Sequence, residues 1–347
     1  MLELVDSAAA DLPPGCFAFV MATGIVAVAA EQTGLAAIAG GLAAIGAMAY
    51  AALGSLLAVR LVRHRRRVAA DLADPMLAPG FFTVAAATAV LGADFTIVVG
   101  WQPAAVALWF VALAIWLVST YAVFFFAIVG GPRASGDAGP GGAWLLACVA
   151  TQGIAVLGTA VAAFFADPGP AIGVSLGAFM LGALLYLALI TLVLQRLVFL
   201  GVSAKALTPP YWISMGAAAI STLAGASLIL DGGASPAAAA LLPFLEGLTL
   251  LFWTAGTWWI PLLAALAVWR HLVRHEPLVY DVQLWSMVFP LGMYSAATRR
   301  LSEATALPLL AVVAQAFFWI ALLSWAWAAA GTLSAAARAR RGRQRPA

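Results

Sequence analysis

Long apolar runs follow one another along almost the whole chain, separated by prolines, glycines and clusters of charge. A helix needs about 20 apolar residues to cross the roughly 30 Å hydrocarbon core of a bilayer, and each run comes close to or exceeds that length. We therefore predict an all-α membrane protein with ten transmembrane helices, over residues 14–31, 36–62, 79–100, 103–130, 143–166, 170–200, 210–230, 236–270, 282–300 and 306–334. The predicted domains are a short cytoplasmic N-terminus (1–12), a ten-helix transmembrane domain (13–334) and a basic cytoplasmic tail (335–347).

The composition supports this class and excludes several others. Hydrophobic residues make up 65% of the 347 residues, charged residues make up 9%, and the mean hydropathy is +1.03. Soluble domains average about 25% charged residues, so a soluble globule, a disordered chain and a nucleic-acid binder are all excluded. The two cysteines, Cys16 and Cys148, fall within apolar runs, where a thiol behaves as a small buried hydrophobe.

The basic residues gather on one side of the predicted membrane. An even number of helices puts both termini on the same side, and all of the 17 Lys and Arg residues except Arg299 and Arg300 fall on that side. By the positive-inside rule, we predict a plasma (inner) membrane protein with both termini in the cytoplasm. The sequence pI of about 9.1 then reflects membrane topology, and no nucleic-acid partner is expected.

A weak internal repeat groups the predicted helices in pairs. The segment Leu12–Phe17 resembles Leu77–Phe82, 65 residues further on, and Ala89–Gly92 recurs as Ala155–Gly158. A period of about 65–75 residues predicts five helical hairpins arranged around an axis normal to the membrane. Chance matches among the abundant Ala, Gly and Leu residues are the alternative explanation.

The two helices of a pair differ in the kinds of side chain they carry. Narrow, partly polar stripes follow the first, third, fifth and seventh predicted helices, whereas the fourth, eighth and tenth carry bulky tryptophans suited to lipid contact. We predict an inner ring of odd-numbered helices around a narrow, pseudo-five-fold pore, enclosed by the even-numbered helices. Close packing of helices through small residues explains the same stripes and remains open as an alternative. The predicted pore-lining residues are Thr23, Thr83, Ala87, Thr151, Ser214, Ser221, Ser286 and Met293.

The sequence holds no constellation typical of an enzyme or a metal site. All three histidines, His64, His271 and His275, lie in basic loops, and neither an HExxH motif nor a phosphate-binding loop is present. We therefore expect a protein that is not an enzyme and that uses no cofactor and no metal.

Two carboxylates within the apolar runs are candidates for proton coupling. Asp94 lies late in the third predicted helix, and Glu246 follows Pro243 early in the eighth. Ionisable side chains in the hydrocarbon region are costly, so each is a functional candidate by default. Both also lie near the outer ends of their helices, where contact with water would explain them equally well.

The ninth predicted helix contains a proline in its middle. Pro290 removes one backbone hydrogen bond and favours a bend, and Ser286, Phe289 and Met293 share one face of the helix. If that face points into a lumen, the ring of Phe289 acts as a hydrophobic plug that excludes hydrated ions. Phe289 and Pro290 are therefore the candidate gate, with an ordinary aromatic wedge beside a kink as the alternative.

Three stretches carry a family resemblance. Pro14–Val26, Gly256–Leu263 and Trp285–Tyr294 resemble the tellurite-resistance/C4-dicarboxylate transporter family, which includes the plant slow-type anion channels and fungal malate and sulfite transporters. The similarity in helix pattern runs from about Leu12 to Ala330. The resemblance implies ten helices in five hairpins, an inner five-helix pore, a homotrimer whose protomers conduct separately, and an aromatic gate that corresponds to Phe289.

The resemblance leaves the substrate open. Similar scaffolds conduct chloride or nitrate, or move malate, sulfite or related oxyanions. We expect no Arg or Lys in the lumen, so anions would be stabilised by hydroxyl groups, freed backbone dipoles and the basic cytoplasmic rim. The predicted function is gated passage of small anions. The alternative is a proton-coupled or potential-driven transporter of C4-dicarboxylates, sulfite or tellurite-related oxyanions, and an intramembrane enzyme or scaffold is the least favoured.

Overall fold

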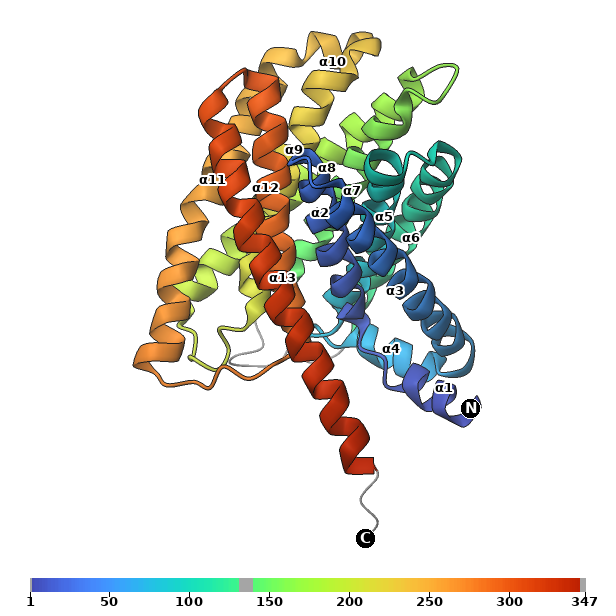
Figure 1. The fold of residues 1–347 in the computed structure, drawn as a ribbon, viewed down its shortest axis with the longest axis vertical. Coiled ribbons are helices and arrows are strands. Elements are labelled where there is room, and N and C mark those ends of the chain that lie inside the picture. Colours follow the sequence, from blue (N-terminus) through green and yellow to red (C-terminus); the bar gives the residue numbers. More distant parts are fainter. Residues whose placement is uncertain (1, 131–139, 344–347) are drawn as a thin grey trace.

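The computed structural model describes residues 2–130 and 140–343, and within these ranges every regular element is a helix (Figure 1). The all-α prediction is therefore confirmed. The last four residues of the predicted tail 335–347 lie outside the described residues. The ten longest helices are α2 (Ala18–Gln32), α3 (Ala36–Arg63), α5 (Phe82–Asp94), α6 (Gln102–Val129), α7 (Leu146–Ala162), α8 (Gly169–Gln195), α9 (Ile213–Asp231), α11 (Leu242–Val268), α12 (Trp285–Thr305) and α13 (Pro308–Arg343). Three shorter helices are α1 (Leu2–Ala10), α4 (Arg65–Ala73) and α10 (Pro236–Ala240).

Nine helical segments of the described ranges are long and apolar enough to cross a membrane. Each coincides with one of the ten predicted crossings, and the chain is therefore a multi-pass membrane protein. The remaining predicted crossing, 282–300, coincides with α12, which is less apolar than the other nine. The C-terminal part of α12 carries Arg299, Arg300 and Glu303, which explains the difference.

Burial divides the membrane-crossing segments into two classes. In the segments that contain α2, α5, α7 and α9, between 72% and 89% of the most apolar stretch is buried. In those that contain α3, α6, α8, α11 and α13, only 11% to 39% is buried. The less apolar α12 belongs with the first class, because most of its side chains are buried.

The five buried helices make a closed cycle of contacts. Helix α2 packs on α5, α5 on α7, α7 on α9, α9 on α12, and α12 returns to α2. We call these five the ring helices. Each ring helix also packs against the long helix that follows it in sequence, and we call α3, α6, α8, α11 and α13 the outer helices (Figure 1).

Glycines allow the ring helices to approach closely at two points. A Cβ atom on Gly216 of α9 would lie 2.8 Å from Cγ of Pro290 on α12. A Cβ atom on Gly92 of α5 would lie 2.4 Å from a methyl group of Leu157 on α7. Small residues bring membrane helices together in this way, because no lipid-driven hydrophobic effect presses them against each other.

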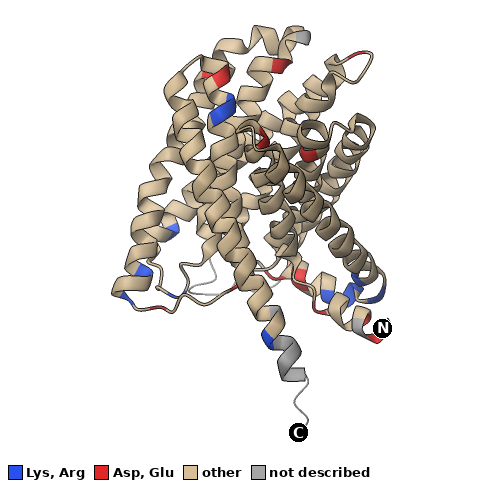
Figure 2. Ribbon diagram, viewed as in Figure 1, with Lys and Arg blue, Asp and Glu red and all other residues tan. Residues whose placement is uncertain are grey.

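Both ends of the described chain lie at one end of the molecule, which also carries most of the described Lys and Arg residues (Figure 2). We call it the basic end. Two ion pairs hold helix α1 and the residue after it at this end. Arg63 at the end of α3 lies 3.3 Å from Asp6 of α1, and Arg67 of α4 lies 2.7 Å from Asp11. This distribution agrees with the charge asymmetry read from the sequence.

Candidate functional site

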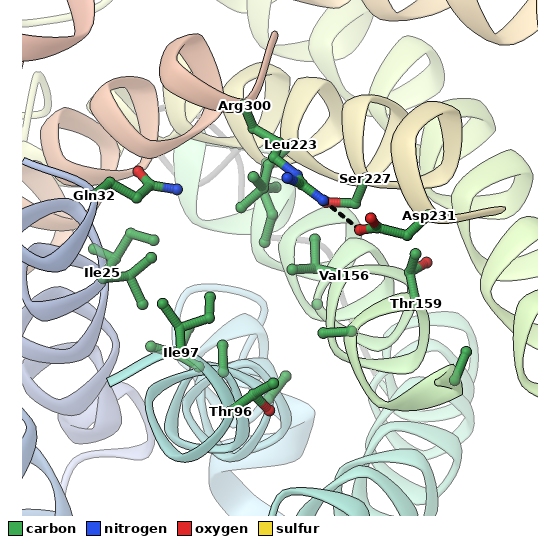
Figure 3. A pocket seen from close by; sticks show the side chains of 18 of the residues that line it. Ile25, Gln32, Thr96, Ile97, Val156, Thr159, Leu223, Ser227, Asp231 and Arg300 are labelled. Carbon is green, nitrogen blue, oxygen red and sulfur yellow. Dashed lines mark hydrogen bonds and ion pairs between the residues drawn. The ribbon is translucent and has the colours of Figure 1, made fainter. Parts of the chain in front are cut away.

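A cavity of about 530 Å³ lies inside the ring and is bordered by all five ring helices (Figure 3). It occupies the half of the ring away from the basic end, because its lining residues come from the C-terminal halves of these helices. Its walls are mainly apolar, with a few hydroxyl groups, one amide and the charged side chains of Asp231, Arg300 and Glu303. Representative lining residues are Ile25, Gln32, Val90, Ala93, Gly153, Val156, Thr159, Ile220, Ser227, Met293 and Arg300.

The faces of α12 can be assigned from their contacts. Gly292 approaches Ile25 and Val26 of α2, whereas Pro290 meets Gly216 of α9. Successive residues of a helix are rotated by about 100°, so Phe289 and Met293 project between these two faces, toward the inside of the ring. Met293 borders the cavity, and Phe289 lies one turn nearer the basic end.

The cavity does not continue past the level of Phe289. Only 2% of Phe289 is exposed, so its ring faces neither lipid nor open water. One turn before the cavity residues of the other ring helices lie the small or apolar residues Met21, Ala86, Val149 and Gly216, all of them buried. The residues at this level are thus buried and small or apolar, and Phe289 is the large aromatic side chain that α12 contributes there.

One of the eight predicted pore-lining residues borders this cavity. Met293 borders the cavity, and Ser286 lies half-buried near the start of α12. Thr83 donates to the carbonyl groups of Pro14 and Gly80, and Ala87 is fully buried. Apart from Met293, none of the predicted lining residues borders the cavity: Thr23, Thr83, Ala87, Thr151, Ser214, Ser221 and Ser286.

Ser221 belongs to a buried polar cluster between α7 and α9. Its hydroxyl accepts a hydrogen bond of 3.1 Å from the amide of Gln152, which also donates to the carbonyl of Phe179. The Cys148 thiol lies 3.8 Å from the same hydroxyl. These groups connect two ring helices to each other and to α8, and Gln152 was not singled out from the sequence.

Thr23, Thr151 and Ser214 belong to a repeated pattern in which an outer helix donates a hydrogen bond to a ring helix. Each outer helix contributes a Tyr or Trp to this pattern, and consecutive donors of the pattern are separated by 66 to 72 residues. Trp109 of α6 also donates to α7, at the carbonyl of Ile154. The partner always lies on the next ring helix along the chain, and α13 closes the cycle on α2. The five pairs are Tyr50 with Thr88 (2.7 Å), Trp116 with Thr151 (2.9 Å), Tyr186 with the carbonyl of Ser214 (3.3 Å), Trp253 with Thr298 (3.1 Å) and Trp325 with Thr23 (3.0 Å).

The two candidate coupling carboxylates lie in different surroundings. Asp94 is 1% exposed, and its Oδ1 atom has no hydrogen-bond partner. It faces α2, since a Cβ atom on Gly24 would lie 2.6 Å from its Oδ2 atom. Glu246 is exposed on the outer helix α11 and does not border the cavity.

The mouth of the cavity carries a basic side chain, contrary to the expectation of a lumen without Arg or Lys. Arg300 reaches from α12 toward α9, where one guanidinium nitrogen pairs with Asp231 (Figure 3). Its other terminal nitrogen lies 3.1 Å from Glu303. Arg299 also pairs with Glu303, at 3.3 Å. The spacing of Phe289, Met293 and Arg300 on one face of α12 is the sequence signal that leads to this residue.

Groups of three or more His, Cys, Asp or Glu residues that could hold a metal ion are absent from the part of the chain that the structure describes. The polar groups that border the cavity are hydroxyl, amide, carboxylate and guanidinium groups.

Comparison with known proteins finds relatives by sequence. The chain is 41% identical over 141 residues to an uncharacterized membrane protein of Mycobacterium tuberculosis, a match that covers 41% of this chain and 71% of that protein. It is 25% identical over 327 residues to an uncharacterized transporter of Methanocaldococcus jannaschii, covering 90% of each chain. A second uncharacterized transporter of that organism is 25% identical over 276 residues, covering 77% of this chain and 76% of the relative.

Among protein families, residues 11–333 match the voltage-dependent anion channel family. The match spans all ten long helices except the last residues of α13, and it confirms the resemblance carried by Pro14–Val26, Gly256–Leu263 and Trp285–Tyr294. The chain belongs to the voltage-dependent anion channel family.

Proposed function

We propose that this protein conducts small anions across the membrane along the axis of the ring helices, with Phe289 as the constriction. The observation that carries the proposal is the cavity bordered by all five ring helices, which ends at the level of Phe289. Membership of the voltage-dependent anion channel family supports anions as the transported species.

The proposed architecture has ten membrane crossings in five hairpins around a pseudo-five-fold axis. The closed cycle of ring contacts supports it, as do the five aromatic hydrogen bonds at a spacing of 66 to 72 residues. In this arrangement α12 is the tenth crossing. Its charged end is compatible with a membrane because Arg300 and Glu303 border the cavity and are partly exposed, so water can reach them.

The constriction is proposed to work as a hydrophobic gate. Apolar side chains meet at the level of Phe289, and an ion would have to shed its hydration shell without compensation to pass them. Pro290 cannot donate a backbone hydrogen bond to the carbonyl of Ser286, which weakens the helix beside the gate. Displacement of the Phe289 ring is thus the movement that opens the passage.

Anions inside the cavity are proposed to be bound weakly. Neutral donors are available from the hydroxyl group of Ser227 and the amide of Gln32, which border the cavity. The hydroxyl groups of Thr96 and Thr159 also border it, but each donates its proton to a backbone carbonyl of its own helical segment. Hydroxyl and amide donors replace part of a hydration shell without a full opposite charge. Weak sites favour rapid passage over tight selectivity.

A proton-coupled transporter is the second candidate function, and one observation favours it. Asp94 is a buried carboxyl group whose Oδ1 atom has no hydrogen-bond partner, on a ring helix that borders the cavity. A buried carboxyl group with an unpartnered oxygen is costly to keep in a membrane protein, and a role in proton binding would explain its presence. Release of a bound proton during transport would couple it to anion movement.

Flux into proteoliposomes distinguishes the two functions. The purified protein is assayed with chloride, nitrate, sulfite, malate and succinate, with and without an imposed pH gradient, alongside Asp94→Asn and Glu246→Gln. A channel gives anion flux that is insensitive to the pH gradient and unchanged in Asp94→Asn. A coupled transporter gives uptake that follows the pH gradient and is lost in Asp94→Asn, while Glu246→Gln serves as the control on the exposed face of α11.

We also propose a plasma (inner) membrane location with both termini in the cytoplasm and assembly as a homotrimer. The concentration of Lys and Arg at the basic end supports the orientation. The trimer rests on the family resemblance. Cross-linking of the protein in native membranes tests it, with a band at three times the monomer mass as the expected result.

A further inference from the structure

The charged groups at the cavity mouth form a small network between α9 and α12. Arg300 binds Asp231 of α9 and Glu303 of its own helix, and Glu303 also binds Arg299. These four charges sum to zero, so the mouth exerts little net attraction on an ion while the network is intact. Asp231, Arg300 and Glu303 border the cavity.

Arg300 projects from the face of α12 that carries Phe289 and Met293. It follows Met293 by seven residues, which is about two helical turns or 10 Å along the axis. Its guanidinium group therefore lies above the apolar constriction, on the path from the opposite end of the molecule to Phe289. Ser227, one turn before Asp231 on α9, and Gln32 of α2 lie around the same part of the cavity (Figure 3).

In the ion pair between Arg300 and Asp231, an anion from solution can take the place of the carboxylate. The two side chains of the pair are 26% and 46% exposed, so water and ions reach both partners. Partly exposed ion pairs contribute little stability, which means that an anion from solution competes effectively with the carboxylate for the guanidinium. A guanidinium offers several donors in one plane, so it can bind an incoming anion while it keeps Glu303.

We propose that Arg300 is the anion-recruiting residue at the mouth of the cavity, and that Asp231 competes with the incoming anion for its guanidinium group. This inference rests on the proposed function and adds to it a specificity-determining site. The ligand is a small anion with the size of chloride or nitrate. In the resting state Asp231 occupies the site, and an anion that displaces it enters the cavity toward Ser227 and Gln32.

The test measures flux against anion concentration in proteoliposomes, with chloride and nitrate as the probes. Arg300→Gln should raise the half-saturating concentration about five-fold, because the cation that attracts the anion is lost. Asp231→Asn should lower it by a similar factor, because the competitor is neutralised. Arg274→Gln is the matched control: it removes an exposed positive charge at the basic end, outside the network and away from the cavity, and the half-saturating concentration should stay unchanged.

An unchanged half-saturating concentration in Arg300→Gln, with flux still present, overturns the proposal. If that variant cannot be purified, Asp231→Asn decides alone, and an equal or higher half-saturating concentration in it also overturns the proposal. Failure of the proposed function is a separate result. In that case neither the parent protein nor Phe289→Ala gives anion flux at any concentration.

Discussion

Hydroxyl side chains of the ring helices are mostly engaged in packing. Thr23 accepts a hydrogen bond from Trp325, and Thr151 accepts one from Trp116. In an apolar interior a hydroxyl group must find a partner, and the outer helices supply indole and phenol donors. The faces turned toward the cavity are left to residues such as Ile25 and Ile220, which need no partner. Polarity alone is thus a poor guide to the lining of this cavity.

Single cysteine substitutions test this assignment of faces. Ser227→Cys and Met293→Cys border the cavity and should react with a membrane-impermeant, anionic methanethiosulfonate reagent added from the cavity side. Thr23→Cys is the matched control, because Thr23 is fully buried on the opposite side of α2. Access controls the rate of thiol modification, so Thr23→Cys should react about tenfold more slowly or not at all. Equal rates at Thr23 and Met293 would contradict the assignment.

Elements repeat along the chain more strictly than the sequence does. In all five units a ring helix is followed by an outer helix, and an aromatic side chain of the outer helix donates a hydrogen bond to the next ring helix. Helix α6 donates a second one, from Trp109 to the carbonyl of Ile154. Two of the five donors are Tyr and three are Trp, and the acceptor is a Thr hydroxyl in four pairs and the carbonyl of Ser214 in the fifth. Because the residue types vary, comparing the sequence of one unit with that of another reveals the repeat only weakly. The spacing of the aromatic donors nevertheless agrees with the predicted period of 65–75 residues.

The pair of Trp325 and Thr23 closes this cycle between the last and first membrane-crossing segments. Trp325→Phe should lower unfolding stability by about 0.6–1.5 kcal/mol, the range for one buried hydrogen bond within a membrane protein. The measurement is thermal unfolding in detergent, with Thr23→Val and the double variant completing a double-mutant cycle. Trp258→Phe, at a tryptophan that is 54% exposed, is the control. A coupling energy of zero would mean that the bond does not stabilise the fold.

At the scale of the whole molecule, the ring and its enclosing layer follow from a few physical constraints. The nine apolar segments were predictable because length and hydropathy report directly on bilayer crossing. The face of α12 that borders the cavity was also predictable, because Phe289 and Met293 are spaced one helical turn apart beside Pro290. The residues with which the other ring helices border the cavity were not predictable in the same way. The hydroxyl stripes that contain Thr23 and Ser221 reflect contacts between helices, which a single sequence does not record. Arg300 was assigned to the correct end of the molecule but not to the cavity.

The central claim is that the Phe289 ring closes the passage along the ring axis, and the most direct measurement is anion flux through purified Phe289→Ala in proteoliposomes. The flux should rise about tenfold or more over the parent protein, because removal of the ring opens a hydrophobic constriction. Phe179→Ala is the control, since Phe179 is equally buried but lies on the outer helix α8. Equal flux in Phe289→Ala and the parent protein, at matched amounts of folded protein, would contradict the account.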